Sequence, residues 1–414
     1  MTFFGILRDS PMALMFVLVT LFNVFYGWRV FRGVGQGWAA LNREPLRREQ
    51  KQLIDRAAFF LGIPLGVLIH ELGHAITVWL FGGQVVDAGY GFYWGYVSHT
   101  GYYTATQLWI IAMAGTIGSL LYGVTMWLLF RQIRLSTYRY FALRVLRVHL
   151  YYSLVFYPLF TLFTFVGDWR IIYNFNDTPL LSGVTLVTHL GILGLFYYSD
   201  RQGLFDMPGF DTVAEQAQFE TLKTQAARNP HDAQLQLQLV DAYRQGDAQH
   251  LATRQLKSYL KASPNSAEGY LQLALVQAQS KRQIPAKAKD NAAKALSLGL
   301  SDPVSVAQAN RIAGEYSLNV GKYGQALERF NQGIAATRSA GRPELSAHLH
   351  YLRAVTYRRQ GNYDLAHHDI LEAIKLARGT GQGQQVSHYE SELATIEGHS
   401  GRSFGSPPQG KQNP

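Results

Sequence analysis

The sequence places three polar side chains with metal chemistry inside an apolar run. In LGIPLGVLIHELGHAITVWLFGG, residues 61–83, the residues His70, Glu71 and His74 form an H-E-x-x-H motif. On a helix the two histidines share one face, so both can bind one zinc ion. The neighbouring glutamate can act as a general base toward water. The motif predicts Zn²⁺ as cofactor, the two histidines as ligands and Glu71 as the catalytic residue.

The apolar surroundings make this motif more specific than it would be in a soluble helix. Ionisable residues within a membrane segment are costly and are usually retained for a function. The small residues Gly62 and Gly66 and the preceding Pro64 favour close helix packing or a bend at this place. The alternative is a polar cluster that only satisfies its own hydrogen bonds.

A catalytic zinc site needs a third protein ligand besides the two histidines. The first candidate is Asp168, an acidic residue in the otherwise apolar segment FTFVGDWRIIYNF. The second is His189 in VTLVTHLGIL, which can instead orient a substrate or bond to a neighbouring helix. The remaining candidates are Asp87, His99 and Asp177.

The elements that must position these residues are membrane-spanning helices. A bilayer core of about 30 Å takes about 20 apolar residues as helix. Five segments come near this length: 11–31, 57–81, 105–130, 149–173 and 179–198. The first is expected to be a retained span and not a signal peptide, because no small-x-small cleavage site follows it.

The charges of the connections predict the orientation. Arg and Lys concentrate in 29–56 and 131–148, whereas 82–104 has neither and 167–178 has only Arg170. The positive-inside rule then puts the N-terminus outside and everything after about residue 200 in the cytoplasm. These features are compatible with a bacterial inner membrane or an equivalent organelle membrane.

The loop 82–104 is rich in Gly and aromatic residues, GGQVVDAGYGFYWGYVSHTGYYT, and predicts short extended strands against the membrane surface. One interpretation is an aromatic belt at the interface. The other is a hairpin beside an active site that pairs with an extended substrate by strand addition.

The second half of the chain repeats. Asn229-Pro230 recurs as Ser263-Pro264 after 34 residues, and GKYGQALERF (321–330) recurs as GNYDLAHHDI (361–370) after 40 residues. A period of 34 residues is that of tetratricopeptide helix pairs, which the region 212–378 resembles, with a capping helix near 384–397. Such solenoids bind peptides or protein partners on a concave surface. The tail after residue 397 has the composition of a disordered segment.

Composition limits the other functions. The chain has 414 residues and no cysteine, which excludes disulfides, Cys-ligated zinc and thiol nucleophiles. The net charge of +10 lies largely in short loops between apolar segments, so membrane topology explains it better than nucleic-acid binding.

The segments HELGHAITVWLFGGQVV, WIIAMAGTIGSLLYG (109–123) and VGDW resemble the site-2-protease group of intramembrane zinc metalloproteases. The resemblance covers about 57–200 and implies zinc held by His70, His74 and Asp168, with Glu71 as general base. Two departures mark a divergent branch. Gly115, Thr116 and Ser119 stand where the group often has Gly-Pro-x-x-Asn, and Gly167-Asp168-Trp169 stands where Leu-Asp-Gly is common. The peptide-binding domain that many members carry is also absent from the sequence.

The sequence therefore predicts an all-α protein: a polytopic bundle of about five transmembrane helices followed by a tetratricopeptide-like α-solenoid. The expected parts are an N-terminal span with a basic loop (1–56), a metalloprotease core (57–200), a linker (201–211), cytoplasmic repeats (212–397) and a disordered tail (398–414). The expected activity is cleavage of a membrane-embedded protein, with Thr116, Ser119 or His189 as oxyanion or substrate contacts. The repeats are expected to recruit a cytoplasmic partner.

Two alternatives remain from the sequence. One is a catalytically inactive protease-like scaffold that only displays the repeats. The other is a zinc hydrolase whose substrate in the bilayer is not a peptide.

Overall fold

The computed structural model describes residues 11–164, 167–279 and 283–400 and consists almost entirely of helices, which confirms the all-α class. The chain divides into two compact units. Unit 1 comprises Met1–Lys223 and Ala242–Leu251, and unit 2 comprises Thr224–Asp241 and Ala252–Pro414. Each unit is described by itself.

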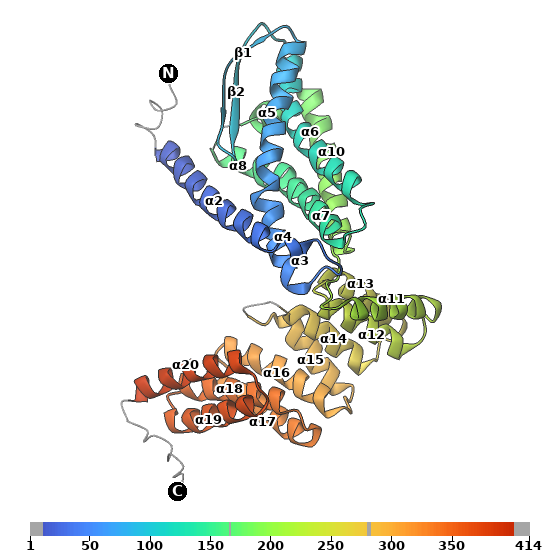
Figure 1. Ribbon diagram of the computed structural model, residues 1–414, viewed down its shortest axis with the longest axis vertical. Coiled ribbons are helices and arrows are strands. Elements are labelled where there is room, and N and C mark those ends of the chain that lie inside the picture. Colours follow the sequence, from blue (N-terminus) through green and yellow to red (C-terminus); the bar gives the residue numbers. More distant parts are fainter. Residues whose placement is uncertain (1–10, 165–166, 280–282, 401–414) are drawn as a thin grey trace. The chain divides into compact units, whose positions relative to one another are not determined.

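Unit 1 holds the apolar helices and the only two strands of the described residues (Figure 1). Its elements are α2 (Pro11–Gln36), α3 (Trp38–Leu41), α4 (Arg48–Phe60), α5 (Gly62–Leu80), β1 (Gln84–Tyr90), β2 (Gly95–Thr100), α6 (Ala105–Phe130), α7 (Ser136–Tyr151), the π-helix η1 (Tyr152–Phe156), α8 (Tyr157–Thr164), α9 (Trp169–Ile172), α10 (Pro179–Arg201) and the greater part of α11 (Val213–Arg228).

Four helical stretches among the described residues are long and apolar enough to cross a membrane: Arg48–Leu80, Ala105–Phe130, Ser136–Phe163 and Pro179–Arg201. The helix α2 forms where the first span is expected but is not one of these four, so the fifth crossing stays a prediction. The expected span 149–173 is wrong in its bounds. Its helix begins at Ser136 and α8 ends at Thr164, which leaves Asp168 beyond the spanning helix.

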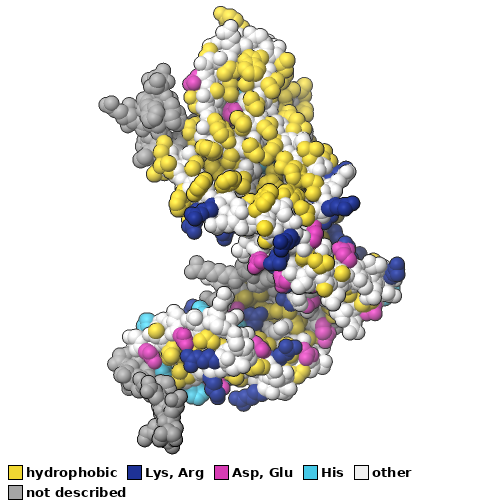
Figure 2. All heavy atoms as spheres, viewed as in Figure 1, with side chains coloured by type: hydrophobic (Ala, Val, Ile, Leu, Met, Phe, Trp, Pro, Cys, Tyr) yellow, Lys and Arg dark blue, Asp and Glu magenta, His cyan; other side chains and the backbone are white. Residues whose placement is uncertain are grey.

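Exposed apolar side chains distinguish these helices from those of a soluble domain. In α5, Leu65, Leu68, Leu72, Ile76 and Trp79 are exposed and recur every three or four residues, so they form one stripe. Hydrophobic side chains cover most of the visible face of these helices in Figure 2. Contiguous apolar surface of this kind is unfavourable in water and suits contact with lipid.

The basic segments between the apolar runs are more ordered than the sequence suggests. The expected loop 131–148 is mostly the start of α7, and 29–56 includes α3 and the beginning of α4. Arg144 Nε lies 2.7 Å from Asp55, and Arg147 Nε lies 2.7 Å from Asp200. These arginines hold the helix ends together as ion pairs, in addition to any role in topology.

The expected linker 201–211 is packed against the rest of unit 1. Phe205 and Phe210 are buried, with 2% and 6% of their surface exposed. The amide nitrogen of Phe210 donates to the carbonyl of Leu46 at 2.8 Å, and that of Gly209 donates to the carbonyl of Gly246. The segment is therefore tied by backbone hydrogen bonds to two distant parts of the chain.

The Gly- and aromatic-rich loop forms the expected strands. β1 and β2 pair as an antiparallel hairpin with Gln84 opposite Thr100 and Tyr90 opposite Gly95, and an irregularity lies between Val85 and Asp87. The hairpin contacts α5 through both strands (Figure 1). The aromatic residues near its turn anchor it, because Tyr90 Oη donates to the carbonyl of Pro64 at 2.8 Å.

Unit 2 is a succession of helices, and from residue 267 onward each packs against its neighbour along the chain. The helices that follow α11 are α12 (Ala233–Gln245), α13 (Gln249–Ala262), α14 (Ala267–Ala278), α15 (Ala286–Ser297), α16 (Pro303–Asn319), α17 (Tyr323–Ala340), α18 (Pro343–Arg359), α19 (Tyr363–Gly379) and α20 (Gly383–Ser400).

Small residues mark the closest helix contacts in unit 2. Ala326 in α17 and Ala366 in α19, which occupy equivalent repeat positions, are both fully buried. The spacing of 40 residues is longer than 34 because α17 and α18 are long helices. Only Gly341 and Arg342 lie between them. The expected tail starts later than predicted, since α20 runs to Ser400, and residues 401–414 lie outside the described part.

A buried ion pair joins α18 to α19. Asp369, which is 1% exposed, accepts hydrogen bonds from Arg353 Nε and Nη2 at 2.6 Å each and from His350 Nδ1 at 2.9 Å. Burial by itself would raise the pKa of Asp369, but the hydrogen bonds from Arg353 and His350 lower it below the ordinary value. The carboxylate is therefore ionised in the folded protein.

We expect Asp369→Ala to destabilise the α18–α19 pair by about 3 kcal/mol, because the buried His350 and the partly buried Arg353 lose their partner. A depressed folded-state pKa stabilises the protein fully above the unfolded value of about 4 and loses that contribution as pH falls through the folded value. Hydrogen exchange of α18 and α19 in the full chain, corrected for intrinsic rates at each pH, measures both effects. The control is Glu344→Ala, an exposed carboxylate at the start of α18. Equal losses in the two variants would contradict the prediction.

Candidate metal centre

The helix α5 brings His70 and His74 together on one face. Their ring centroids are 4.7 Å apart, and the rings lie nearly perpendicular at 82°. The Nε2 atoms of His70 and His74 approach the same atom, Oδ2 of Asp168, at 2.9 and 3.2 Å. The three residues offer ligand atoms that all lie within 4.8 Å of one another.

Asp168 reaches the histidines from a turn between α8 and α9. Gly167 precedes it with φ +124°, a conformation that side chains other than glycine rarely adopt. Trp169, which follows, is 3% exposed and packs with Ala112 of α6 and Ile172. The buried indole packs this turn against α6 and so sets the position of the Asp168 carboxylate relative to α5.

The second nitrogen of each imidazole is also occupied. Nδ1 of His74 donates to the carbonyl of Ile111 at 2.7 Å, and Nδ1 of His70 lies 3.3 Å from Oγ of Ser119. Ser119 in turn donates to the carbonyl of Gly66. Metal-binding histidines commonly make this outer contact because it sets the tautomer that leaves Nε2 with its lone pair.

Gly115 of α6 leaves room in front of the two imidazoles. A Cβ at this position would lie 2.4 Å from Nε2 of His74 and 2.6 Å from Nε2 of His70. The absence of a side chain keeps open the space into which both nitrogens point. Two imidazoles and a carboxylate around such a space fit the ligand set of zinc.

Glu71 lies beside the hairpin. A Cβ at Gly95, the first residue of β2, would lie 2.5 Å from Cγ and 2.7 Å from Oε1 of Glu71. The hairpin backbone therefore passes directly over the carboxylate. Tyr152 Oη donates to the carbonyl of Tyr93 at 3.0 Å, which ties η1 to the hairpin.

His189, the second candidate for a third ligand, does not belong to this group. His189 is buried, and its Nε2 and Nδ1 lie 2.7 Å from the carbonyl of Leu154 and 2.5 Å from Oη of Tyr173. Both ring nitrogens are thus engaged, and of the two alternatives the structure favours the one in which His189 bonds to neighbouring elements. Thr116 is buried on α6, next to Gly115.

The remaining candidates for a third ligand contact residues that are close to them in sequence. Asp87 accepts from Tyr96 Oη at 3.0 Å, and Asp177 accepts from Asn174 Nδ2 at 2.7 Å. The ring of His99 packs on that of Tyr103. Among the described residues, none of these three belongs to the group that could hold a metal ion.

Sequence reasoning missed Tyr157, which donates a hydrogen bond to Asp168. Ser119, which was expected as an oxyanion or substrate contact, lies 3.3 Å from Nδ1 of His70. No spacing rule marks Tyr157, because it lies 11 residues from Asp168 on an interrupted helix. The small residues of α6, Gly115 and Gly118, are a weaker signal, since glycines facing another membrane helix usually serve packing alone.

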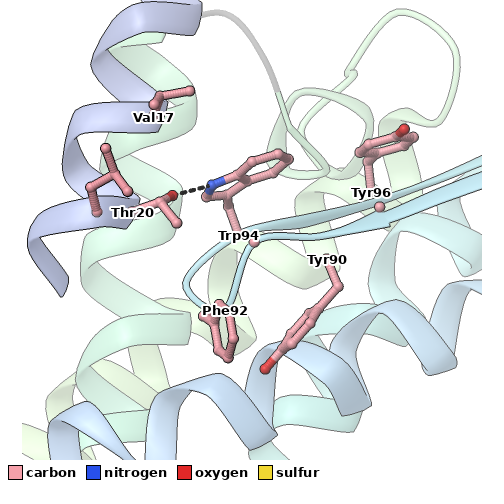
Figure 3. A pocket seen from close by; sticks show the side chains of 9 residues that line it. Val17, Thr20, Tyr90, Phe92, Trp94 and Tyr96 are labelled. Carbon is pink, nitrogen blue, oxygen red and sulfur yellow. Dashed lines mark hydrogen bonds between the residues drawn. The ribbon is translucent and has the colours of Figure 1, made fainter. Parts of the chain in front are cut away.

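A pocket of about 410 Å³ lies on the hairpin, between its turn and α2 (Figure 3). Four of its nine lining residues are aromatic, and Nε1 of Trp94 donates to Oγ1 of Thr20 at 2.8 Å. Trp94 and Tyr96, which both line this pocket, flank Gly95, the residue beside Glu71. The pocket and the candidate metal centre thus share the start of β2.

The comparisons with known proteins assign no function, so the function is inferred from the site. No family model matches this chain, and no curated protein matches it.

Proposed function

We propose that this chain is a zinc-dependent endopeptidase that cleaves a membrane-embedded protein. The observation that carries the proposal is the convergence of His70, His74 and Asp168 on one space, with Glu71 adjacent, within helices apolar enough to cross a membrane. Such a group of ionisable residues is expensive in lipid, and a catalytic role accounts for its retention.

The chemistry that zinc supplies when bound is polarisation of the scissile carbonyl and activation of water near neutral pH. His70, His74 and Asp168 would hold the ion, and their outer hydrogen bonds would keep them in place. Glu71 would take a proton from the attacking water and deliver it to the nitrogen of the leaving amine. The low polarity around the site strengthens each of these interactions relative to bulk water.

The hairpin supports a peptide substrate over a lipid-like one. A peptide bond within a regular helix is shielded, so the substrate must be extended where it is cut. The start of β2 passes over Glu71, and an extended segment paired with the hairpin would run alongside the general base. Strand pairing would position the peptide through its backbone and leave its side chains free to meet the aromatic pocket.

The proposed setting follows from charge and hydropathy. Five crossings, with the basic segments 29–56 and 131–148 inside, would put the N-terminus outside and unit 2 in the cytoplasm of a bacterial inner membrane or an equivalent organelle membrane. In unit 2 the succession of helices with buried alanines at equivalent positions supports a tetratricopeptide-like solenoid. We propose that it recruits a substrate or a cytoplasmic protein.

The zinc content of the detergent-purified protein tests the metal site. The native chain is expected to hold about one zinc ion, and His74→Ala and Asp168→Asn are expected to hold far less, because each removes one of the three ligands. His189→Gln is the matched control, since this histidine is buried nearby but bonds to Leu154 and Tyr173. A folded native protein without zinc would exclude the protease and leave a repeat-displaying scaffold.

A further inference from the structure

The hydroxyl of Tyr157 makes two contacts with Asp168. Oη donates to Oδ2 of the carboxylate at 2.9 Å and accepts from the amide nitrogen of the same residue at 3.2 Å. The ring also lies edge-on to His70, with centroids 5.6 Å apart at 78°. One side chain therefore touches the backbone and the carboxylate of one proposed ligand and the ring of another.

A helix irregularity places this tyrosine. Tyr157 is the first residue after the π-helix η1, which interrupts the spanning stretch between α7 and α8. A π-turn holds one residue more than an α-turn, so the residues beyond it are rotated by about 100° from their positions in an unbroken α-helix. Such irregularities occur frequently at functional sites.

The turn that carries Asp168 is shaped around the same hydroxyl. Gly167 adopts φ +124°, and a Cβ there would lie 3.0 Å from Oη of Tyr157 and 2.8 Å from Oγ1 of Thr161. His70 and His74 are held by the hydrogen bonds of α5, but Asp168 lies beyond the end of its spanning helix. Its carboxylate needs another support to keep a fixed direction.

We propose that Tyr157 is a positioning residue for the metal centre. It ties the amide and the carboxylate of Asp168 together and so holds Oδ2 at the position where it meets both imidazoles. The proposal rests on the proposed function, because it assumes that these three residues bind zinc. Outer hydrogen bonds of this kind contribute about 10–100-fold to metal affinity.

The test is a comparison of two hydroxyl deletions in the full-length protein. Tyr157→Phe removes the hydroxyl at Asp168, and Tyr140→Phe removes one that donates to Asp55 at 2.9 Å, away from the metal centre. Zinc affinity is measured by competition with a chromophoric chelator. We expect the Kd to rise about 10–100-fold for Tyr157→Phe and to stay at the native value for Tyr140→Phe.

The visible spectrum of the cobalt(II)-substituted protein reports ligand geometry independently of affinity. Its bands are expected to change in Tyr157→Phe and to remain native in Tyr140→Phe. A native Kd and a native cobalt spectrum in Tyr157→Phe would overturn the role of Tyr157 and leave the zinc site intact. A native protein that binds neither metal would overturn the proposed function as well.

A second variant guards against a general effect of losing the hydroxyl. Gly167→Ala keeps Tyr157 but puts a methyl group against its Oη, so zinc affinity is expected to fall here too. Gly341→Ala is the control, because it has φ +61° but nothing within 4 Å of the added Cβ. Equal zinc affinity in these two glycine variants would contradict the proposal.

Discussion

Replacing Glu71 by glutamine is expected to lower the rate of substrate cleavage by about 100–10,000-fold, the usual contribution of a general acid–base residue. Glutamine keeps the shape of the side chain but cannot accept the proton of the attacking water. The zinc content is expected to stay at the native level, because the proposed ligands are His70, His74 and Asp168. This combination separates a catalytic role from a role in metal binding.

The measurement for Glu71→Gln uses a set of single-span membrane proteins reconstituted with the full-length chain. New N-termini identified by mass spectrometry reveal cleavage at any position in any protein of the set. Glu49→Gln is the control, an exposed carboxylate at the start of α4. If new termini appear equally with native protein and with Glu71→Gln, the proposed mechanism is wrong. If the native protein cleaves none of these proteins but hydrolyses a lipid-like ester, the substrate class is wrong.

Replacing Gly115 by alanine is expected to weaken zinc binding by at least about 100-fold, the upper range for loss of a supporting residue. The added Cβ would stand 2.4 and 2.6 Å from the two Nε2 atoms, which is closer than van der Waals contact allows. The methyl group must either occupy the metal position or push α6 away from α5. In both cases the Nε2 atoms of His70 and His74 can no longer bind the same ion.

Two other glycine variants separate these causes. Gly183→Ala in α10 adds a methyl group with nothing within 4 Å and is expected to bind zinc as the native protein does. Gly118→Ala brings a Cβ to 2.9 Å from the carbonyl of Ile69, so it disturbs the contact between α5 and α6 without touching the imidazoles. Titration with a chelator measures the zinc affinity of the three glycine variants, and thermal unfolding measures their stability. Native zinc affinity in Gly115→Ala would show that the metal does not lie between the histidines.

Part of the architecture was predictable because its causes are local. Apolar length predicts helices, and the four long apolar stretches confirm this coarse expectation. The Gly- and aromatic-rich loop predicts strands, which form as β1 and β2. Helix ends were harder to predict. The segment 149–173 reads as one span by hydropathy, yet its helix starts at Ser136 and contains η1. A π-turn and a break near Gly167 depend on packing, which average hydropathy does not record.

The two histidines and the glutamate could be found in the sequence because helix periodicity alone brings positions i and i+4 to one face. Asp168 was the first of several candidates for the third ligand, because few acidic residues stand in the apolar half, and the family resemblance implied the same residue. His189 has the same favourable context in the sequence, and only the structure shows its ring nitrogens engaged by Leu154 and Tyr173. Burying a polar residue in an apolar helix costs free energy, but the sequence does not show which contact offsets that cost.

The sequence by itself determined the local features: the H-E-x-x-H face, the apolar helices, the hairpin and the repeating second half. The tertiary structure decided which distant residues meet at that face. Asp168 arrives across 98 positions of sequence from His70, and Tyr157 is turned toward it by a π-helix. The physical reason is that periodicity acts within one element, whereas a metal centre needs atoms from several elements at distances of a few ångströms. Only the packing of α5, α6, α8 and the turn before α9 brings those atoms together.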